Sequence, residues 1–186
     1  MSADAKGYAA TSRSVSLSGS PAMVVDFALA PVDAGPPAAI TFANVGADKS
    51  PVTDYAEAGF RVAATAASWI AIRTYGQPAP FIQFMSPGGV TTTGGIQVTA
   101  GGNSFSFKSV DFYSSTTPIP YVITGVSKGA TVFRLSNTLG NTFGNFATVA
   151  NPQPTALIDA LSIDLTNPAA PCCPNPMGID NIAVSR

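Results

Sequence analysis

The residues of this sequence that could do chemistry are few, because it contains no histidine and only one glutamate, Glu57. Without imidazole there is no Ser-His-Asp triad, no Cys-His pair and no histidine zinc site, and the commonest general base near neutral pH is missing. A hydrolase or lyase would have to rest on a carboxylate pair, for which Asp111, Asp159 and Asp164 are candidates. They could form a pair in space, which spacing along one sequence does not show. Because the usual catalytic residues are missing, we expect no catalytic residue and no enzymatic activity.

Glu57 and Asp180 could instead hold a cation. Asp180 shares strand parity with Ile182 and Val184, which should face the core, so its carboxylate is expected on the buried side. A buried carboxylate must be paired or bound to a cation. Glu57 could supply a second oxygen, with carbonyl groups, Asn181 or water completing the oxygen shell that calcium takes; zinc lacks suitable ligands. The alternative is that Asp180 caps a turn and that Glu57 is solvated.

Three aromatic residues are candidates for binding a sugar, because the C–H face of a sugar packs well on an aromatic ring. They are Trp69, Tyr75 in the loop-like Tyr-Gly-Gln-Pro segment, and Tyr113 at the end of an expected strand. The alternative is that these rings pack in the core or at a sheet edge. For Trp69, which is flanked by apolar residues, the core is the favoured alternative.

Cys172 and Cys173 are adjacent in the sequence Pro-Cys-Cys-Pro. Adjacent cysteines cannot join distant parts of a fold, and a vicinal disulfide between them would bring the Cα atoms closer than in ordinary disulfides. The Pro-rich flanks predict an exposed loop, where a vicinal disulfide could form a rigid contact surface. The alternatives are two reduced thiols or an intermolecular bridge.

The elements that must position these residues are short strands. Runs rich in Val, Ile, Phe, Thr and Tyr alternate with Gly and Pro, at the spacing of about 8–12 residues that is typical of an antiparallel sandwich or barrel. No long helix is expected. The expected strands are Ile40 to Val45, Gly59 to Thr65, Ser68 to Arg73, Phe81 to Met85, Gly95 to Thr99, Ser104 to Tyr113, Tyr121 to Val126, Thr131 to Leu135, Phe143 to Val149, Leu157 to Leu165 and Ile179 to Val184.

One expected strand changes its apolar parity along its length. Phe105 and Phe107 share one parity, and Val110 and Phe112 share the other. A β-bulge near Lys108-Ser109 would explain the change, as would a strand that is buried on both faces.

The first 38 residues differ in character from the rest. Two expected strands, Arg13 to Ser18 and Met23 to Leu29, are followed by a segment too rich in Pro and Gly to pair in a ladder. We interpret residues 1–38 as an N-terminal arm or hairpin with a linker, and residues 39–186 as the sandwich domain. The arm would either lie on its own sandwich or reach another subunit.

Composition limits the partners. Nine Lys and Arg residues balance ten Asp and Glu residues, so the net charge of −1 offers no field for nucleic acid or for an anionic membrane. No apolar stretch is long enough to span a bilayer, so no membrane insertion is expected. The N-terminus lacks the features of a secretory signal, which leaves open whether one was removed. The Gly-rich segments lack the lysine and helix of phosphate-binding loops.

Two short motifs carry a resemblance to a known group of proteins. Tyr55-Ala56-Glu57-Ala58-Gly59-Phe60 and Ile179-Asp180-Asn181-Ile182-Ala183-Val184 resemble the Y-x-E-x-G-F and D-N-I-x-V signatures of bacterial exported β-sandwich domains. Such domains occur in proteins with PEP-CTERM sorting tails and are similar to carbohydrate-binding modules. The resemblance spans roughly residues 39 to 185, but this sequence lacks the sorting tail and carries the unusual Cys-Cys insert.

The resemblance implies a jelly-roll β-sandwich without catalytic machinery, often with a structural calcium where the first and last strands meet. Glu57 and Asp180 match its acidic positions. We therefore expect an extracellular glycan-binding or adhesion module stabilised by calcium. The alternative is a structural subunit of a surface assembly, such as a virion decoration protein, a virion fibre protein or an extracellular filament, that self-associates through its N-terminal arm.

Overall fold

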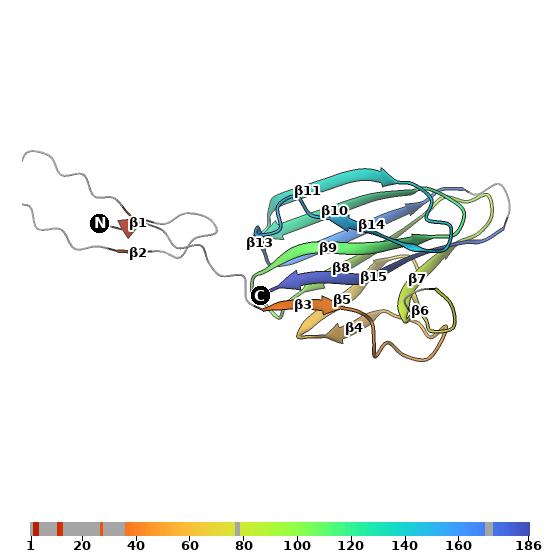
Figure 1. Ribbon diagram of the computed structural model, residues 1–186, viewed down its shortest axis with the longest axis horizontal. Coiled ribbons are helices and arrows are strands. Elements are labelled where there is room, and N and C mark those ends of the chain that lie inside the picture. The colour runs from red at the N-terminus through yellow and green to blue at the C-terminus, as the bar shows by residue number, and fades with distance from the viewer. Residues whose placement is uncertain (1, 4–10, 13–26, 28–35, 77–78, 170–172) are drawn as a thin grey trace, which may run out of the picture. The chain divides into compact units, whose positions relative to one another are not determined.

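Short β-strands joined by turns make up the fold, as the alternation of β-branched and aromatic runs with Gly and Pro predicts. The computed structural model describes residues 2–3, 11–12, 27, 36–76, 79–169 and 173–186, and these contain strands but no helix. Most of the strands form two antiparallel sheets packed face to face (Figure 1). The predicted all-β antiparallel sandwich is therefore confirmed.

The first sheet has six strands in the order β11-β10-β14-β8-β5-β4. Their bounds are β4 Asp54–Glu57, β5 Phe60–Ala66, β8 Thr92–Thr99, β10 Ile119–Ser127, β11 Ala130–Leu139 and β14 Ala160–Asn167. Two neighbouring pairs, β4 with β5 and β10 with β11, are hairpins between consecutive strands. The others are brought together by longer crossovers.

The second sheet has seven strands, with β12-β9-β15-β7-β6 as its main path, β13 beside β9 and β3 beside β15. Their bounds are β3 Pro37–Ile40, β6 Ile70–Ile72, β7 Phe81–Ser86, β9 Phe105–Ser114, β12 Phe146–Ala150, β13 Leu157–Ile158 and β15 Asn175–Ser185. The first strand of the sandwich, β3, thus pairs with the last, β15.

The core lies between the two sheets and is built by period-two alternation. In β14 the residues Leu161, Ile163 and Leu165 are fully buried, whereas Ser162 and Asp164 between them are partly exposed. Alternation of this kind is what a strand with one buried face requires. At roughly 1.5–3 kcal/mol for each buried large apolar side chain, this core supplies most of the drive to fold.

The parity change in β9 coincides with a bulge, which is one of the two explanations that the sequence left open. Ser109 lies opposite Ala183 and Phe107 lies opposite Val184. Ala183 and Val184 are consecutive, so Lys108 is an extra residue in β9 without a partner in β15. Phe105 and Phe107 in one half of β9 and Phe112 in the other are therefore buried in the same core. A second irregularity lies next to the bulge, between the pairs Asp111–Asp180 and Ser109–Ala183. Here β9 has one residue, Val110, and β15 has two, so the extra residue belongs to β15.

Several strands differ from the sequence expectation. The single strand expected from Leu157 to Leu165 is two strands, β13 and β14, which lie in different sheets, and the strand expected from Phe143 begins at Phe146. We expected a strand from Ile40 to Val45, but β3 ends at Ile40 because Phe42 takes a positive φ of 54° and Val45 donates to its carbonyl in a turn. The structure also contains β4, Asp54–Glu57, which the sequence analysis did not assign as a strand.

The chain divides into two compact units, Met1–Ala34 and Gly35–Arg186. In the first unit β1, Ser2–Ala3, pairs antiparallel with β2, Thr11–Ser12. The strands expected at residues 13–18 and 23–29 lie almost wholly outside the described residues. Pro37 and Ala38, which we had assigned to the N-terminal segment, pair with β15 within the sandwich. The described residues contain no helix with the length and apolar character that crossing a membrane would require.

Candidate functional site

A cluster of aromatic side chains lies on the seven-stranded sheet, apart from the main core. Phe81 of β7, Tyr113 of β9 and Phe146 of β12 have ring centroids 5.1–5.5 Å apart. Ile70 and Ile72 of β6 pack beside them. Phe81, Tyr113 and Phe146 alternate with residues such as Ile82 and Phe112 that face the core, so we assign the cluster to the outer face of the sheet.

Tyr75 extends this aromatic cluster to the surface. Its ring meets Phe81 edge to face at 6.0 Å, and 40% of the residue is exposed. The hydroxyl group donates a 2.7 Å hydrogen bond to Oε1 of Gln83, which is buried on β7. Burial raises the pKa of Tyr75 above its ordinary value, so the ring is neutral at physiological pH. Tyr75 is thus a fixed aromatic side chain with part of its surface open to solvent.

Tyr113 is brought into the same cluster, in contact with Phe81 and Phe146, but is only 5% exposed. Its hydroxyl group shares a 2.9 Å hydrogen bond with Ser115. Tyr113 therefore supports Tyr75 through Phe81 and offers little surface of its own to a ligand.

Trp69 does not join them. It is 1% exposed, packs against Phe84 with ring centroids 4.9 Å apart, and donates from Nε1 to the carbonyls of Ala66 and Gly95. The ligand-binding role assigned to Trp69 is therefore corrected: the indole ring belongs to the main core, where both of its functions, apolar packing and hydrogen bonding, are already used.

Three aromatic residues of this region were missed by the sequence analysis. Phe81 and Phe146 begin strands whose other apolar residues face the core, and alternation along Phe81-Ile82-Gln83-Phe84 could have revealed this. Phe143 is 78% exposed on the loop that leads into β12. That loop is fastened to the end of β9, where Thr142 and Ser114 exchange hydrogen bonds and Gly144 donates to the Ser114 carbonyl.

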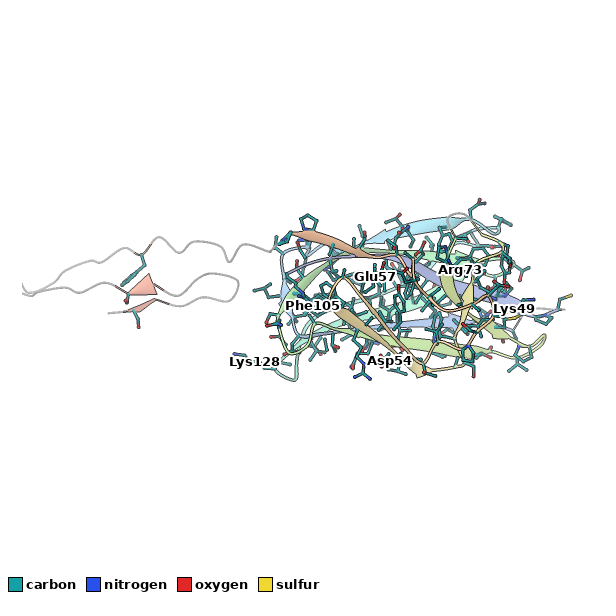
Figure 2. The ribbon with its side chains drawn as sticks, turned by 90° about the horizontal axis from the view of Figure 1, so that it is seen from below. Lys49, Asp54, Glu57, Arg73, Phe105 and Lys128 are labelled. Carbon is teal, nitrogen blue, oxygen red and sulfur yellow. The ribbon has the colours of Figure 1, made fainter. Side chains whose placement is uncertain are left out.

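Acidic residues meet in a second region, where β3, β4 and β15 come together. Glu57 accepts hydrogen bonds from the backbone amides of Thr41 and Phe42, each 2.8 Å long, and from the Thr41 hydroxyl at 2.9 Å. In Figure 2 Glu57 lies between Phe105 and Arg73 along the length of the sandwich. The alternative that Glu57 is simply solvated is wrong, because its carboxylate accepts hydrogen bonds from the turn after β3.

Asp180 is almost completely buried, with 1% of its surface exposed. Its Oδ1 is a buried side-chain atom with no hydrogen-bond partner among the described residues. Burial, followed by the charges of Asp111 and Glu57, raises the pKa of Asp180 to about 7, although a hydrogen bond from the Asn181 backbone acts in the opposite direction. A carboxylate at this position is costly unless a cation or proton compensates it.

Asn181 lies at the irregularity in β15, with a positive φ of 47°. Its amide nitrogen donates to Oδ2 of Asp111 at 2.9 Å, while Oδ1 of Asp111 accepts from Thr148 at 2.6 Å. Asn181 thus holds Asp111 beside Asp180. Because β15 has an extra residue here, Asp180 and Ile182 do not have to face the same side of the sheet, although the sequence analysis assumed that they do. The burial of Asp180 was predicted correctly but for the wrong reason, since Asp180 lies opposite Asp111.

Glu57 and Asp180, the two acidic residues predicted to bind a cation, lie close enough for the charge of Glu57 to act on Asp180, but they do not complete a site. No group of three or more Cys, Asp or Glu side chains within the described parts of the chain is arranged to hold a metal ion. A cation at Asp180 would need backbone carbonyls or water as further ligands. The unpartnered Oδ1 fits a calcium ion, which takes oxygen ligands and accepts irregular geometry.

The carboxylates considered for catalysis are used separately. Asp159 accepts a hydrogen bond from the Lys128 amide at a turn. Asp164 lies on β14 beside Gly95, in the sheet opposite to Asp111, and burial raises its pKa, although the charge of Arg134 opposes the shift. The structure brings none of these three together as an acid–base pair.

Cys172 lies outside the described residues, so the vicinal disulfide stays a prediction. Cys173 is exposed and has a positive φ of 65°. Its position between β14 and β15 agrees with the expected loop.

Comparisons with known proteins assign no family to the chain. No protein-family model matches it, and no curated protein matches it. Similar solved structures include a mutant of the CBM29-2 carbohydrate-binding module complexed with mannohexaose (13% identity, 81% of this chain and 91% of that chain, TM-score 0.47). CBM29_1 from Piromyces equi is also similar (10% identity, 81% of this chain and 89% of that chain, TM-score 0.48). So is TmCBM61 in complex with β-1,4-galactotriose (9% identity, 69% of this chain and 89% of that chain, TM-score 0.44). At these low identities and scores, function has to be argued from the chain's own residues.

Proposed function

We propose that this chain is a non-catalytic carbohydrate-binding or adhesion module that binds a glycan through Tyr75 and the aromatic cluster beneath it. The observation that carries the proposal is that Tyr75 is both fixed and exposed. Phe81 and the hydrogen bond to Gln83 hold the ring, while 40% of the residue remains accessible. A ring that is already ordered loses little conformational entropy when a sugar packs on it.

Phe143 is the second contact that we propose for the same ligand. It is 78% exposed, which is unusual for a large apolar side chain, and its loop is tied to β9 next to Tyr113. Solvent-exposed apolar residues of this size commonly mark a binding surface. Together Tyr75 and Phe143 would contact an extended sugar chain from both sides of the aromatic cluster.

The decisive experiment is binding to a panel of soluble polysaccharides by affinity electrophoresis, followed by calorimetry on any hit. Tyr75→Ala and Phe143→Ala should each weaken binding at least about tenfold, which corresponds to ~1.4 kcal/mol. Val90→Ala is the matched control, because Val90 is also exposed, at 48%, but belongs to another loop. Binding that is unchanged in Tyr75→Ala, or absent for every polysaccharide, would refute this function. Hydrolysis of any glycan in the panel would contradict the non-catalytic assignment.

We further propose that calcium stabilises the module at Asp180. The unpartnered Oδ1 of Asp180, with the Glu57 carboxylate nearby, supports an oxygen-ligand cation at this position. Calcium should raise the unfolding temperature relative to EDTA, because it binds only the folded state. Asp180→Asn should abolish that increase and Glu57→Gln should reduce or abolish it. Asp164→Asn, which alters another partly buried carboxylate, should leave it intact. Equal melting of the unaltered chain in calcium and EDTA would rule the site out.

As an adhesion or glycan-binding module, the chain would act outside the cell, on a cell or virion surface. The second candidate function is a structural subunit of a self-assembling surface structure. It is favoured by the division of the chain into two compact units, of which Met1–Ala34 is one. Light scattering on the full chain and on a version that starts at Gly35 separates the two. Large assemblies that need residues 1–34 would favour the structural subunit.

A further inference from the structure

The edges of the two sheets are unequally protected. An edge strand exposes unpaired backbone groups that can pair with another chain, and natural proteins commonly keep such strands short or charged. Among the described strands, β3, β4, β6 and β12 are edge strands of three to five residues. Of these, β3 begins at Pro37, and β4 carries Asp54 in an ion pair with Arg61.

The strand β11 is different, because its ten residues pair only with β10 (Figure 1). Its sequence, Ala-Thr-Val-Phe-Arg-Leu-Ser-Asn-Thr-Leu, has no proline and one charge, Arg134. The register with β10 is regular from Phe133 to Leu139, after a bulge at Val132. This regular segment has neither of the usual protections, a proline or several charges.

The direction of the backbone groups of β11 follows from two observations. Thr138 lies opposite Pro120, which has no N–H group to donate to it, and the Thr138 amide donates to the side chain of Asn137. In an antiparallel pair, residues that bond across the ladder alternate with residues that do not. Arg134, Ser136 and Thr138 therefore direct their N–H and C=O groups away from β10, toward the open edge.

We propose that β11 pairs antiparallel with β11 of a second copy of this chain, around a two-fold axis at Leu135. Residues that lie opposite each other have side chains on the same face of the sheet. Even-numbered residues of β11 can therefore pair only with even-numbered residues of the second copy, and odd-numbered with odd-numbered. A register with Arg134 opposite itself would bring two like charges together. In the next register Leu135 lies opposite Leu135 of the second copy, and Arg134 lies opposite Ser136.

A second copy fits this edge better than an unrelated strand. The proposed register joins the outward groups of Arg134 and Ser136 in hydrogen-bonded pairs. It also covers Leu135, which is only partly buried against the core. A net charge of −1 causes little repulsion between two copies. The two six-stranded sheets would become one continuous sheet, with the same surface used on both copies.

Size exclusion with light scattering on the full chain, over a range of concentrations, tests the pairing. We expect a dimer for the unaltered chain and for the control Ser136→Ala. We expect a monomer for Ser136→Pro, because proline removes an outward donor that the intramolecular ladder does not use. Amide exchange should protect the N–H groups of residues 134 and 136 in the unaltered chain and in Ser136→Ala, and should leave the Arg134 N–H unprotected in Ser136→Pro. A monomer at every concentration, or a dimer that survives Ser136→Pro, would overturn the proposal.

Charge variants at the same position test the register, and they keep the proposal falsifiable if Ser136→Pro does not fold. In the proposed register Ser136 lies opposite Arg134 of the second copy. Ser136→Glu should therefore tighten the dimer, and Ser136→Lys should weaken it, each by a few-fold, at low salt. Equal dimer dissociation constants for the two variants would contradict the register.

Discussion

Two pairs of opposing residues, or rungs, in the β9–β15 ladder have opposite character, with one rung between them. At one rung Tyr113 faces Gly178, and the missing side chain of glycine leaves room for the Phe81 ring. Two residues further along, Asp111 faces Asp180. The first rung belongs to a filled aromatic cluster. The second places two carboxylates opposite each other, one of them buried and lacking a partner for Oδ1 among the described residues.

The difference shows which of the two rungs the protein stabilises by its own side chains and which needs a bound proton or cation. The aromatic rung is stabilised by apolar burial and ring contacts within the protein itself. The acidic rung is stabilised only if something neutralises Asp180, either a proton or a cation. Variants at the first rung should therefore act on packing alone, whereas variants at the second should depend on pH and on calcium.

The largest effect is expected from Phe81→Ala. Phe81 is fully buried and contacts Tyr75, Tyr113 and Phe146, so its removal leaves a cavity in the centre of the aromatic cluster. We expect the free energy of unfolding in urea to fall by about 3–5 kcal/mol, independently of pH and calcium. A loss below about 1 kcal/mol would show that the cluster is not a packed unit.

Asp180→Asn should have the next largest effect, and in the opposite direction. The pKa of Asp180 is raised to about 7, from 3.8 in the unfolded chain, so between pH 4 and 7 the folded state holds more protons. The free energy of unfolding of the unaltered chain in EDTA should therefore fall as pH rises through this window, by about 2–4 kcal/mol. Asp180→Asn should remove the fall and be the more stable protein at pH 7.

Calcium sharpens this second prediction. Under the calcium proposal the cation would bind the ionised form of Asp180, so its stabilising effect should grow as pH rises through the same window. Urea unfolding at pH 4.5 and 7, with calcium and with EDTA, measures both slopes. A flat profile in EDTA for the unaltered chain would mean that Asp180 has another neutralising partner.

The two rungs also differ in how far they could be predicted from sequence. Alternation predicted the sandwich and most of its strands, because burial on one face leaves a period of two in the sequence. The change of parity near Lys108 indicated either a bulge or a strand buried on both faces. The burial of Asp180 was also expected from alternation along the strand, but alternation is interrupted at the extra residue Asn181. A bulge in one strand is defined by its partner strand, which a single sequence does not display.

The aromatic residues were harder to predict for a related reason. Trp69 and Tyr113 are similar in sequence context, each beside apolar residues at a strand, yet the structure places them in different clusters. Which face of a sheet is covered depends on the other strands. The Glu57 contacts with Thr41 and Phe42 span about 16 residues and depend on the turn after β3, so they too had no local signal.

Gly178→Ala tests how closely the aromatic rung is filled. A Cβ atom at Gly178 would lie 2.9 Å from the Phe81 ring and 3.0 Å from the Ile82 carbonyl, and backbone cannot move aside easily. We expect a loss of about 1–3 kcal/mol from overpacking, again without dependence on pH. Gly89→Ala gives a contrast, since no atom lies within 4 Å of its Cβ position, although its positive φ adds some strain. An equal loss in both variants would place the cost in the backbone and not in the cluster.

Tyr75→Phe should have the smallest effect on stability and separates support from recognition. The variant keeps the ring against Phe81 but removes the hydroxyl donor, which leaves Oε1 of buried Gln83 without that bond. We expect a loss of about 0.5–1.5 kcal/mol in unfolding. Glycan affinity should change little, because stacking uses the face of the ring, whereas Tyr75→Ala should lose it. If Tyr75→Phe lost affinity as strongly as Tyr75→Ala, the hydroxyl group and not the ring would be the contact. The ligand would then be recognised by hydrogen bonding at Gln83 and not by packing on the cluster.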